Sequence, residues 1–443
     1  AGPVGFNIGY EHRKEFASFT PSDFQQAGRG RSVPITPLSG SYNLDEVFGE
    51  LAIPLVREEN GIPFIHSAQV IGRGRYSDNT VNGGFFSYTV GGNIAPIPDI
   101  EFRGNLTRSF RSPAITELFL PTVNTFAFVP DLCQPSARNA GPAPAVRAAN
   151  CAAFIAAFPG TDFTSPDPAS TASVPAQSGG NQNLDNEQAD SYSFGVIVRP
   201  RFIPRLAITA DYVDITLNDP IANLTIAQIA SGCFDNANFD TTDPANGNSF
   251  CSRINYGPNG RVQGDPQNPA VVSGFVNGNQ IKFSGIQGTI DYNFPVLGGN
   301  LTVGGNMLYV RRRLVDITGV APSRTDGIIG DPEFSGQVRL RYAQRDFGVT
   351  ATVNYTGEQL FSRLNRATGV SGSGPDAREI DKLNDYVVVS GGIFFDPADD
   401  FRLTLSVTNL FNRQGQSYFG ELIPASYNDT LGRRFQISAR AKF

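Results

Sequence analysis

The sequence predicts an all-β fold, a transmembrane antiparallel β-barrel, and three observations lead to this prediction. The 443 residues include 47 Gly, 34 Phe and 14 Tyr but a single Met, and only 17% of them are charged, a composition that favours strands and turns over helices. Apolar and polar residues alternate with a period of two through about fourteen segments. The connections between these segments alternate between short and long. The sequence contains no run of about 18 apolar residues, so no transmembrane helix is predicted.

The alternation is clearest at the end of the chain, where Phe435, Ile437 and Ala439 are separated by single polar residues. Many segments reach about ten residues, the length that a tilted strand needs to cross a bilayer, whereas strands of soluble proteins average about five or six. In chain order, the clear strands are predicted at 4–13, 100–107, 206–212, 286–294, 334–342, 347–356, 401–408 and 435–443, and the weaker ones at 43–56, 62–76, 81–92, 188–199, 299–313 and 384–396.

Two kinds of connection alternate along the chain, with one exception near Asp78, where only a brief connection is found in place of a long one. This asymmetry is typical of outer-membrane barrels, which have short periplasmic turns and long extracellular loops. A soluble propeller or solenoid is the alternative, but no repeat of about 20–50 residues supports it. Short turns are predicted at 57–61, 92–96, 200–204, 295–299, 343–346 and 396–400, and long loops at about 18–42, 111–187, 218–279, 314–332, 359–383 and 412–432.

The four cysteines form two pairs with equal spacing, Cys133 with Cys151 and Cys233 with Cys251, one pair in each of the two longest loops. Two local disulfides, formed in an oxidising compartment, fit this pattern best. A zinc site is the competing interpretation. The sequence has no Cys-x-x-Cys motif to support a zinc site, and its two histidines lie on predicted strands far from the cysteines in sequence.

Composition and motifs exclude several classes of function. The net charge of −6 removes any general electrostatic case for binding nucleic acid. We expect no enzyme, because no Gly-x-Ser-x-Gly, His-Glu-x-x-His or Walker motif is present. We expect no cofactor or metal either. A calcium ion held in an extracellular loop by Asp235, Asp240 and Asp243 is the one alternative, and these residues lack the spacing of an EF-hand.

Three segments resemble the C-terminal part of the barrel of TonB-dependent outer-membrane transporters. Residues 102–119 contain an Arg-Ser-Pro step followed by Glu-Leu-Phe, residues 405–412 are similar to the family's Val-x-Asn-Leu-Phe-Asn motif, and residues 433–443 resemble its closing strand, which ends on an aromatic signal for barrel assembly, here Phe443. Each segment also has a plain interpretation. The asparagines are common turn formers, a terminal Phe can anchor at a membrane interface, and arginines can solvate a strand end.

The resemblance implies a barrel of about twenty-two strands closed around a plug domain. Residues 1–443 would then be the C-terminal portion of that barrel, with the plug and the first strands absent from this chain. A second chain or fragment, or a longer parent protein, would carry them. The implied function is TonB-driven uptake of a scarce nutrient across the Gram-negative outer membrane. An iron–siderophore is the commonest ligand of the family, followed by oligosaccharides, peptides and cobalamin. The implied partners are outer-membrane lipid and the TonB complex.

Ligand capture is expected in the first long loop, where the Cys133–Cys151 disulfide would hold the loop ready for a ligand. Protection from proteases explains such a disulfide equally well. A small helix is predicted at 148–158. Two other functions stay open: a passive fourteen-stranded pore, which would close strand 4–13 onto strand 435–443 within one chain, and a structural or adhesive surface barrel. The candidate ligand residues are Arg108, Arg111, Phe119, Phe126 and Phe128.

Overall fold

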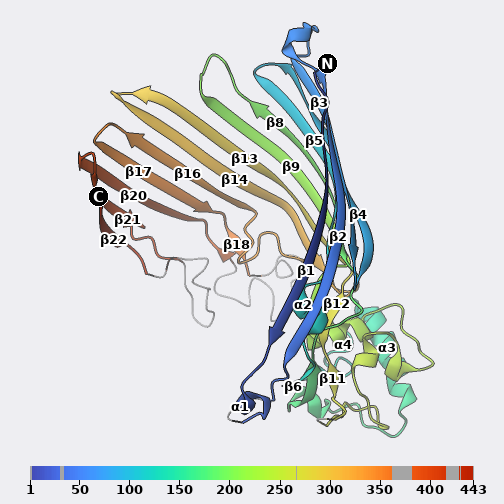
Figure 1. The fold of residues 1–443 in the computed structure, drawn as a ribbon. Helices are drawn as coiled ribbons and strands as arrows, with labels where there is room; N and C mark the ends of the chain where they lie inside the picture. The colour runs from blue at the N-terminus through green and yellow to red at the C-terminus, as the bar shows by residue number, and fades with distance from the viewer. Residues whose placement is uncertain are drawn as a thin grey trace.

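A computed structural model describes residues 2–29, 34–265, 267–361, 382–415, 429 and 431–442. Within these residues, fourteen strands form one curved antiparallel sheet, in which each strand pairs with the next one along the chain (Figure 1). The strands of this sheet are β1 (Gly5–Phe19), β2 (Leu38–Val56), β3 (Ser67–Asn79), β4 (Gly83–Ile97), β5 (Ile100–Arg111), β8 (Glu187–Val198), β9 (Leu206–Asn218), β13 (Gln280–Val296), β14 (Gly299–Asp316), β16 (Phe334–Ala343), β17 (Phe347–Thr356), β20 (Tyr386–Ala398), β21 (Phe401–Thr408) and β22 (Arg434–Ala441).

Each strand of the sheet overlaps one predicted segment, so the predicted fold class is confirmed. The predicted turn at 92–96 is wrong, because β4 continues to Ile97 and the turn falls at residues 98–99. Gly91, Gly92 and Pro96 have the composition of a turn. In the sheet, however, a side chain on Gly92 would place its Cβ 2.5 Å from the backbone oxygen of Gln69, so this glycine allows two backbones to approach closely.

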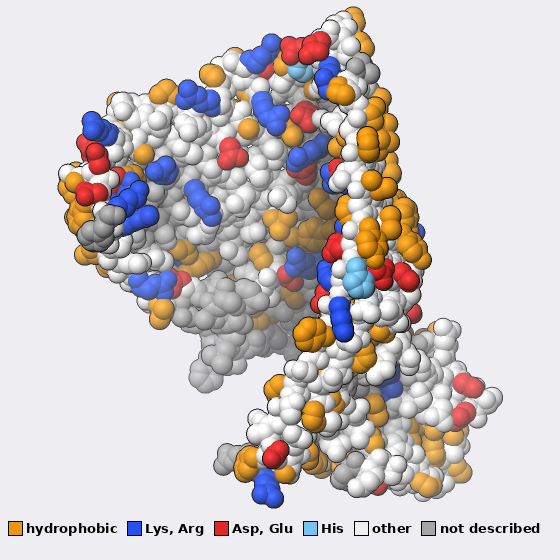
Figure 2. All heavy atoms as spheres, viewed as in Figure 1, with side chains coloured by type: hydrophobic (Ala, Val, Ile, Leu, Met, Phe, Trp, Pro, Cys, Tyr) orange, Lys and Arg blue, Asp and Glu red, His pale blue; other side chains and the backbone are white. Residues whose placement is uncertain are grey.

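The sheet has an outer face rich in apolar side chains and an inner face rich in polar ones. On β1, Phe6 and Ile8 are 80% and 74% exposed and share one side, whereas Asn7 and Glu11 lie on the other. Because residues paired across strands share a face, the register carries this division across the whole sheet. Figure 2 looks into the concave inner face, where Lys, Arg, Asp and Glu are scattered among other polar groups, while apolar side chains gather along the outer edge.

The long connections of the sheet lie at one end and the short turns at the other (Figure 1). Residues 112–186 and 219–279 are the two longest connections, and they fold together into one unit, which we call the loop unit. Both clusters of buried hydrophobic side chains in the described chain lie in this unit. Its elements are α2 (Ile115–Phe119), β6 (Val123–Ala127), α3 (Pro144–Ala157), β7 (Val174–Ser178), β10 (Ile221–Leu224), α4 (Ile226–Phe234), β11 (Val271–Val272) and β12 (Gly274–Asn277), with short 3-10 turns at Pro168–Ser170, Pro244–Asn246 and Cys251–Arg253.

The remaining connections carry only short elements. These are α1 (Asp23–Gln26), a 3-10 turn at Glu58–Asn60, β15 (Ser323–Arg324), which pairs with β14, and the pair β18 (Gln359–Leu360) and β19 (Lys382–Leu383). Much of the predicted loops 359–383 and 412–432 lies outside the described residues. None of the described helices is long and apolar enough to cross a membrane.

The two edges of the sheet are β1 and β22, and within the described residues they are not paired with each other. In Figure 1 they border the two sides of an open, curved sheet. The closure of strand 4–13 onto strand 435–443, which a self-contained fourteen-stranded pore requires, is therefore not formed.

Candidate ligand-binding surface

Both predicted disulfides are formed in the loop unit. Cys133 and Cys151 have Cα atoms 5.2 Å apart, and those of Cys233 and Cys251 are 4.6 Å apart. Each disulfide closes a loop within a single connection of the sheet. All four sulfur-bearing side chains nevertheless belong to one buried cluster, so the two connections share a core.

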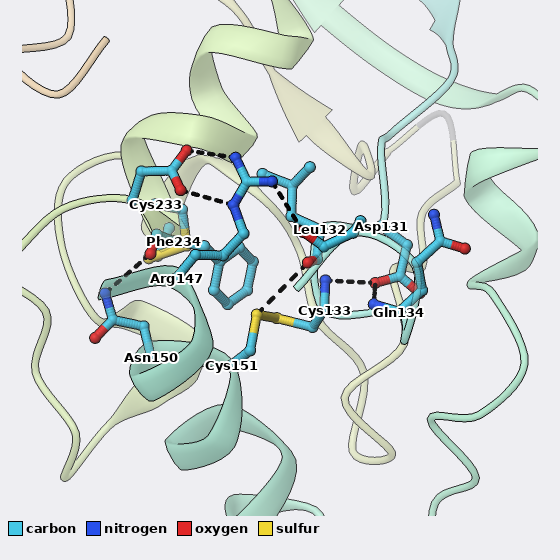
Figure 3. Close-up of a disulfide and its surroundings, with 12 residues drawn as sticks. Asp131, Leu132, Cys133, Gln134, Arg147, Asn150, Cys151, Cys233 and Phe234 are labelled. Carbon is cyan, nitrogen blue, oxygen red and sulfur yellow. Dashed lines mark hydrogen bonds and ion pairs between the residues drawn. A yellow bond between two sulfur atoms is a disulfide. The ribbon is translucent and has the colours of Figure 1, made fainter. Parts of the chain in front are cut away.

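A buried ion pair joins the two connections (Figure 3). Arg147 on α3 donates through Nε and Nη2 to the two carboxylate oxygens of Asp235, with both distances 2.6 Å. The side chains are only 7% and 0% exposed. Asn150, one turn further along α3, donates to the backbone oxygens of Phe234 and Asn236 at 3.0 and 2.8 Å. The C-terminal end of α4 is thus held against α3 by charge-assisted hydrogen bonds, which are the strongest kind.

Aromatic side chains pack with the two disulfides in the shared core. The Phe154 ring lies between 4.8 and 5.4 Å from the rings of Phe158, Phe234 and Tyr256. Burial, reinforced by nearby carboxylates, raises the pKa of Tyr256 above its usual value, so its hydroxyl stays neutral. The helix predicted at 148–158 is therefore part of α3, and its Phe154 forms the centre of the shared core.

A second polar contact joins the same two connections near the surface of the loop unit. The Arg261 guanidinium lies 4.9 Å from the centre of the Phe163 ring and donates to the backbone oxygen of Ser165 at 3.0 Å. The Asp167 carboxylate accepts a hydrogen bond from the Val262 backbone at 2.8 Å. The loop unit is therefore braced from both sides and presents a preformed surface at the loop end of the sheet.

Arg111, a predicted ligand residue, lies at the base of the loop unit. Its guanidinium donates to Glu187 at 2.5 Å and to both carboxylate oxygens of Glu117 at 2.9 and 3.2 Å. Glu187 in turn accepts from the Ile221 backbone at 2.6 Å. Arg111 therefore connects β5, α2 and β8, and through Glu187 also β10, at the point where the sheet passes into the loop unit.

The other predicted ligand residues are spread over different surfaces. Arg108 forms a two-pronged ion pair with Asp190 on the outer face of the sheet. Phe119 is half-buried at the end of α2, where α2 contacts β2. Phe126 and Phe128 are 64% and 58% exposed on the loop unit, on β6 and just after it. The structure does not bring these side chains together into one site, and Phe443 lies outside the described residues.

The three aspartates considered for calcium serve other contacts. Asp235 holds Arg147, and the exposed carboxylate of Asp240 accepts hydrogen bonds from the Thr242 hydroxyl and backbone. Those hydrogen bonds hold the pKa of Asp240 below its usual value. Asp243 accepts from the Asn246 side chain at 3.1 Å. In the described part of the chain, no group of three His, Cys, Asp or Glu side chains is placed to hold a metal ion.

The inner face of the sheet carries charged residues that the sequence pattern did not single out. Arg103 on β5 reaches across β8 to Asp211 on β9, with distances of 2.7 and 2.6 Å. Gly195 on β8 is in register with both residues. A side chain at Gly195 would overlap the Asp211 carboxylate, so the ion pair requires glycine at this position.

The inner face of β16 to β22 is distinctly basic. We call its five arginines, Arg339, Arg341, Arg402, Arg434 and Arg440, the basic wall. Arg402 pairs with Asp396 and Arg434 with Asp429, whereas the other three have no acidic partner among the described residues. The guanidinium groups of Arg341 and Arg402 lie 5.7 and 4.4 Å from the Phe394 ring centre. An isolated Arg on a polar strand face is ordinary, so only the register, which sets these strands side by side, reveals the wall.

The Asn-Leu-Phe-Asn segment follows β21, and its two asparagines stabilise the end of this strand. Asn409 and Asn412 both have positive φ angles, 53° and 52°, a conformation that Asn tolerates better than most residues. The Asn409 side chain is fully buried and exchanges hydrogen bonds of 2.8 Å with the backbone of Arg413. Asn412 accepts from the Arg433 backbone at 2.9 Å, which helps to position the start of β22. The motif therefore ends β21 and helps to hold the start of β22 in place.

Solved structures of bacterial receptors share this fold. The siderophore receptor PirA of Acinetobacter baumannii aligns with 100% of this chain at 13% identity and a TM-score of 0.60. The ferric enterobactin receptor PfeA of Pseudomonas aeruginosa aligns with 99% at 18% identity and a TM-score of 0.58. The hemophore receptor HasR of Serratia marcescens aligns with 99% at 13% identity and a TM-score of 0.50. The alignments cover 52%, 52% and 58% of those chains, so this chain spans about half of their length.

No curated protein matches the sequence. A family model, described as "TonB dependent receptor-like, beta-barrel", matches residues 3–410. This match covers nearly the whole sheet and the entire loop unit. The chain therefore belongs to the TonB-dependent receptor β-barrel family.

Proposed function

We propose that this chain forms the C-terminal part of a TonB-dependent outer-membrane transporter that takes up a scarce nutrient, with an iron–siderophore as its first expected ligand. The observation that carries the proposal is the division of the sheet into an apolar outer face and a charged inner face, with a braced loop unit at one end. An apolar exterior matches lipid, and a polar interior matches a water-filled passage. The braced loop unit would face the outside and capture the ligand, and the short turns would face the periplasm.

The basic wall supports the proposal that the ligand is an anion, such as an iron–siderophore. Three of its arginines have no acidic partner among the described residues, and a wall of one charge sign raises the local concentration of ligands of opposite sign. Two of the similar solved structures are named as receptors for siderophores or ferric enterobactin. Oligosaccharides, peptides and cobalamin follow as less favoured ligands.

The unpaired edge strands of the sheet support the proposal that further strands complete it. A strand edge inside a membrane needs hydrogen-bond partners, because lipid cannot satisfy backbone N–H and C=O groups. We therefore propose that additional strands pair with β1 and β22, and that they come with a plug domain through which TonB acts. A second polypeptide and a longer parent protein are both compatible sources of these strands.

Uptake in the native host tests the function. Cells grown under iron limitation are given a panel of iron-loaded siderophores, with and without this protein and with and without TonB. The proposal predicts uptake of at least one siderophore that requires both. Uptake that requires the protein but not TonB would support a passive pore instead. Normal uptake of every siderophore of the panel without the protein would contradict siderophore transport and favour a structural or adhesive barrel.

The variant Arg339→Gln/Arg341→Gln tests the role of the basic wall. It removes two of the unpaired charges, and we expect a several-fold loss of uptake with assembly unchanged. Arg199→Gln removes a charge at the short-turn side of the sheet, where the side chain lies near Glu101, and serves as the matched control. Equal uptake by the wild type and the basic-wall variant would show that the wall does not contact the ligand.

A further inference from the structure

The outer face of the sheet carries a patch of cations at the loop ends of β13 and β14. Alternate residues of a strand face the same side, so Lys282 and Ser284 lie on the same side of β13 as the exposed apolar residues Ile286 and Ile290. Arg312 on β14 is directly opposite Ser284. Lys282 and Arg312 therefore both face outward. They lie on neighbouring strands, and Arg312 is opposite Ser284, the next outward-facing residue of β13 after Lys282.

A β-bulge adds a third cation to the same side. The register passes from Gly285 opposite Val310 to Ser284 opposite Arg312, which leaves Arg311 as the extra residue of β14. The Arg311 guanidinium donates to the Tyr212 hydroxyl at 3.3 Å. Tyr212 is opposite Ile286 and so belongs to the outer face. The bulge thus directs two consecutive arginines outward, where a regular strand would send one of them inward.

The charge of this patch is largely uncompensated. Lys282, Arg311 and Arg312 form no ion pair with any described residue, and the Arg311 guanidinium donates to the Tyr212 hydroxyl. Three acids lie on the same face near the patch, and each has a hydrogen-bond partner elsewhere. Asp214, opposite Ser284, accepts from the Tyr212 hydroxyl at 3.1 Å. Asp316, opposite Gln280, accepts from the Asn279 side chain at 2.7 Å, and Asp190, opposite Thr216, pairs with Arg108. None of these acids forms an ion pair with Lys282, Arg311 or Arg312 within the described residues.

A fourth cation borders the patch but is neutralised. Arg324 on β15 is opposite Leu314, which is itself opposite Lys282. Its guanidinium is 2.6 Å from the buried carboxylate of Asp326. The patch is therefore defined by Lys282, Arg311 and Arg312, and we call it the outer cationic patch.

Large apolar and aromatic side chains lie directly below the outer cationic patch. One register row on the outer face runs across five strands and contains Phe194, Tyr212, Ile286, Tyr309 and Phe334. A second aromatic level follows near the short turns, where the Tyr292 and Phe294 rings are 4.5 Å apart. From Ser284 to Phe294 is about ten residues, which at about 3.3 Å each and a tilt of about 40° cover roughly 25 Å, the height of the apolar band of an outer-membrane barrel.

We infer that the outer cationic patch binds the phosphate groups of a phosphorylated lipid headgroup in the outer leaflet. The patch lies just beyond the apolar band, at the level of headgroups, and arginine and lysine are the residues that bind phosphate through charge-assisted hydrogen bonds. The acyl chains of the same lipid would cover Ile286 and Tyr309 below. This inference rests on the proposed membrane location with the loop unit outside.

The retention of lipid by the purified protein tests the inference. Wild-type protein and the variant Lys282→Gln/Arg312→Gln are extracted from outer membranes in mild detergent, and bound phosphorylated lipid is quantified by native mass spectrometry. We expect roughly a tenfold drop in retained lipid for the double variant, since each basic residue near a membrane surface contributes measurably to anionic lipid binding. Arg312→Lys keeps the charge and should retain most of the lipid. Arg339→Gln/Arg341→Gln removes the same charge from the inner face and should retain lipid as the wild type does.

The outcomes separate this inference from the proposed function. Every variant is first checked for insertion by its heat-modifiable migration in gels. A wild type that does not insert into the outer membrane would refute the proposed function. A wild type that inserts while the Lys282→Gln/Arg312→Gln variant retains equal lipid would refute the lipid site alone. Release of the lipid by inorganic phosphate would identify a general anion site and would also overturn the lipid assignment.

Discussion

The buried ion pair between Arg147 and Asp235 gives the sharpest prediction about the loop unit. Asp235→Ala would leave the Arg147 guanidinium buried at 7% exposure without its two hydrogen bonds of 2.6 Å. Removing one partner of a buried pair typically costs about 3–5 kcal/mol, because the other charge is left uncompensated. At about 1.4 kcal/mol for each factor of ten, even the lower figure raises the open population of the loop unit roughly a hundredfold.

Amide hydrogen exchange measures this effect directly, since exchange rates in a stable element report its local opening. We expect exchange in α3 and α4 to accelerate by about two orders of magnitude in Asp235→Ala, while β13 and β14 keep their wild-type rates. Asp243→Ala is the matched control, because it removes an exposed carboxylate from the same unit and should stay within about 0.5 kcal/mol of the wild type. An acceleration of less than about threefold in α3 and α4 would refute the reasoning, because the pair would then behave like an exposed one.

Three further predictions concern the disulfide, the inner face and pH. Replacing Cys133 and Cys151 with serine releases a loop of 18-residue separation, which should cost the loop unit about 3 kcal/mol and lower ligand uptake, measured as cellular accumulation, more than the thermal stability of the sheet. Gly195→Ala should displace Asp211 from its ion pair and lower the temperature at which the folded band disappears in heated gel samples. The exposed Asp162 carboxylate accepts hydrogen bonds from the Thr164 hydroxyl and backbone, which hold its pKa below its usual value of 3.8. A lowered folded-state pKa stabilises the loop unit above pH 3.8 and loses this contribution as the pH falls further, so resistance to an acid-stable protease should be constant near neutrality and decline below about pH 4.

The controls for these predictions come from the same chain. Gly72→Ala meets no atom within 4 Å and should leave the folded band unchanged. Equal melting of Gly195→Ala and Gly72→Ala would contradict the steric account of the inner ion pair. Uptake that is unchanged without the Cys133–Cys151 disulfide would leave protease protection as its role. Protease resistance that declines already near pH 6 would indicate that other groups control the acid response.

The strand pattern could be predicted from sequence because alternation is local. Phe435 and Ile437 reveal a two-faced strand without knowledge of its neighbours, and the same holds for each of the fourteen strands. The predicted turn at 92–96 is wrong because Gly92 lies within a strand, where the close backbone of Gln69 leaves no room for a side chain. This strand partner cannot be recognised from the local pattern. The cysteine pairs were predictable since each pair is close in sequence.

The functional surfaces depend on partners far apart in sequence. Arg147 and Asp235 are 88 residues apart, and nothing near either residue identifies the other. The position of Arg108 near a long loop favours contact with a ligand, but the register places it on the outer face beside Asp190. The outer cationic patch depends on a single-residue bulge in β14, which alternation alone cannot locate.

Labelling of single cysteines in intact cells tests the central claim, that the sheet lies in the outer membrane with the loop unit outside. The four cysteines of this chain are in disulfides, so an introduced thiol is the one free cysteine among residues 1–443. With a maleimide reagent too large to cross the outer membrane, Thr242→Cys in the loop unit should be labelled in intact cells, and Gln344→Cys in a short turn should be labelled only after the membrane is opened. Ile393→Cys on the outer face should resist labelling in both states. Labelling of Gln344→Cys in intact cells, or ready labelling of Ile393→Cys in the membrane, would contradict the account.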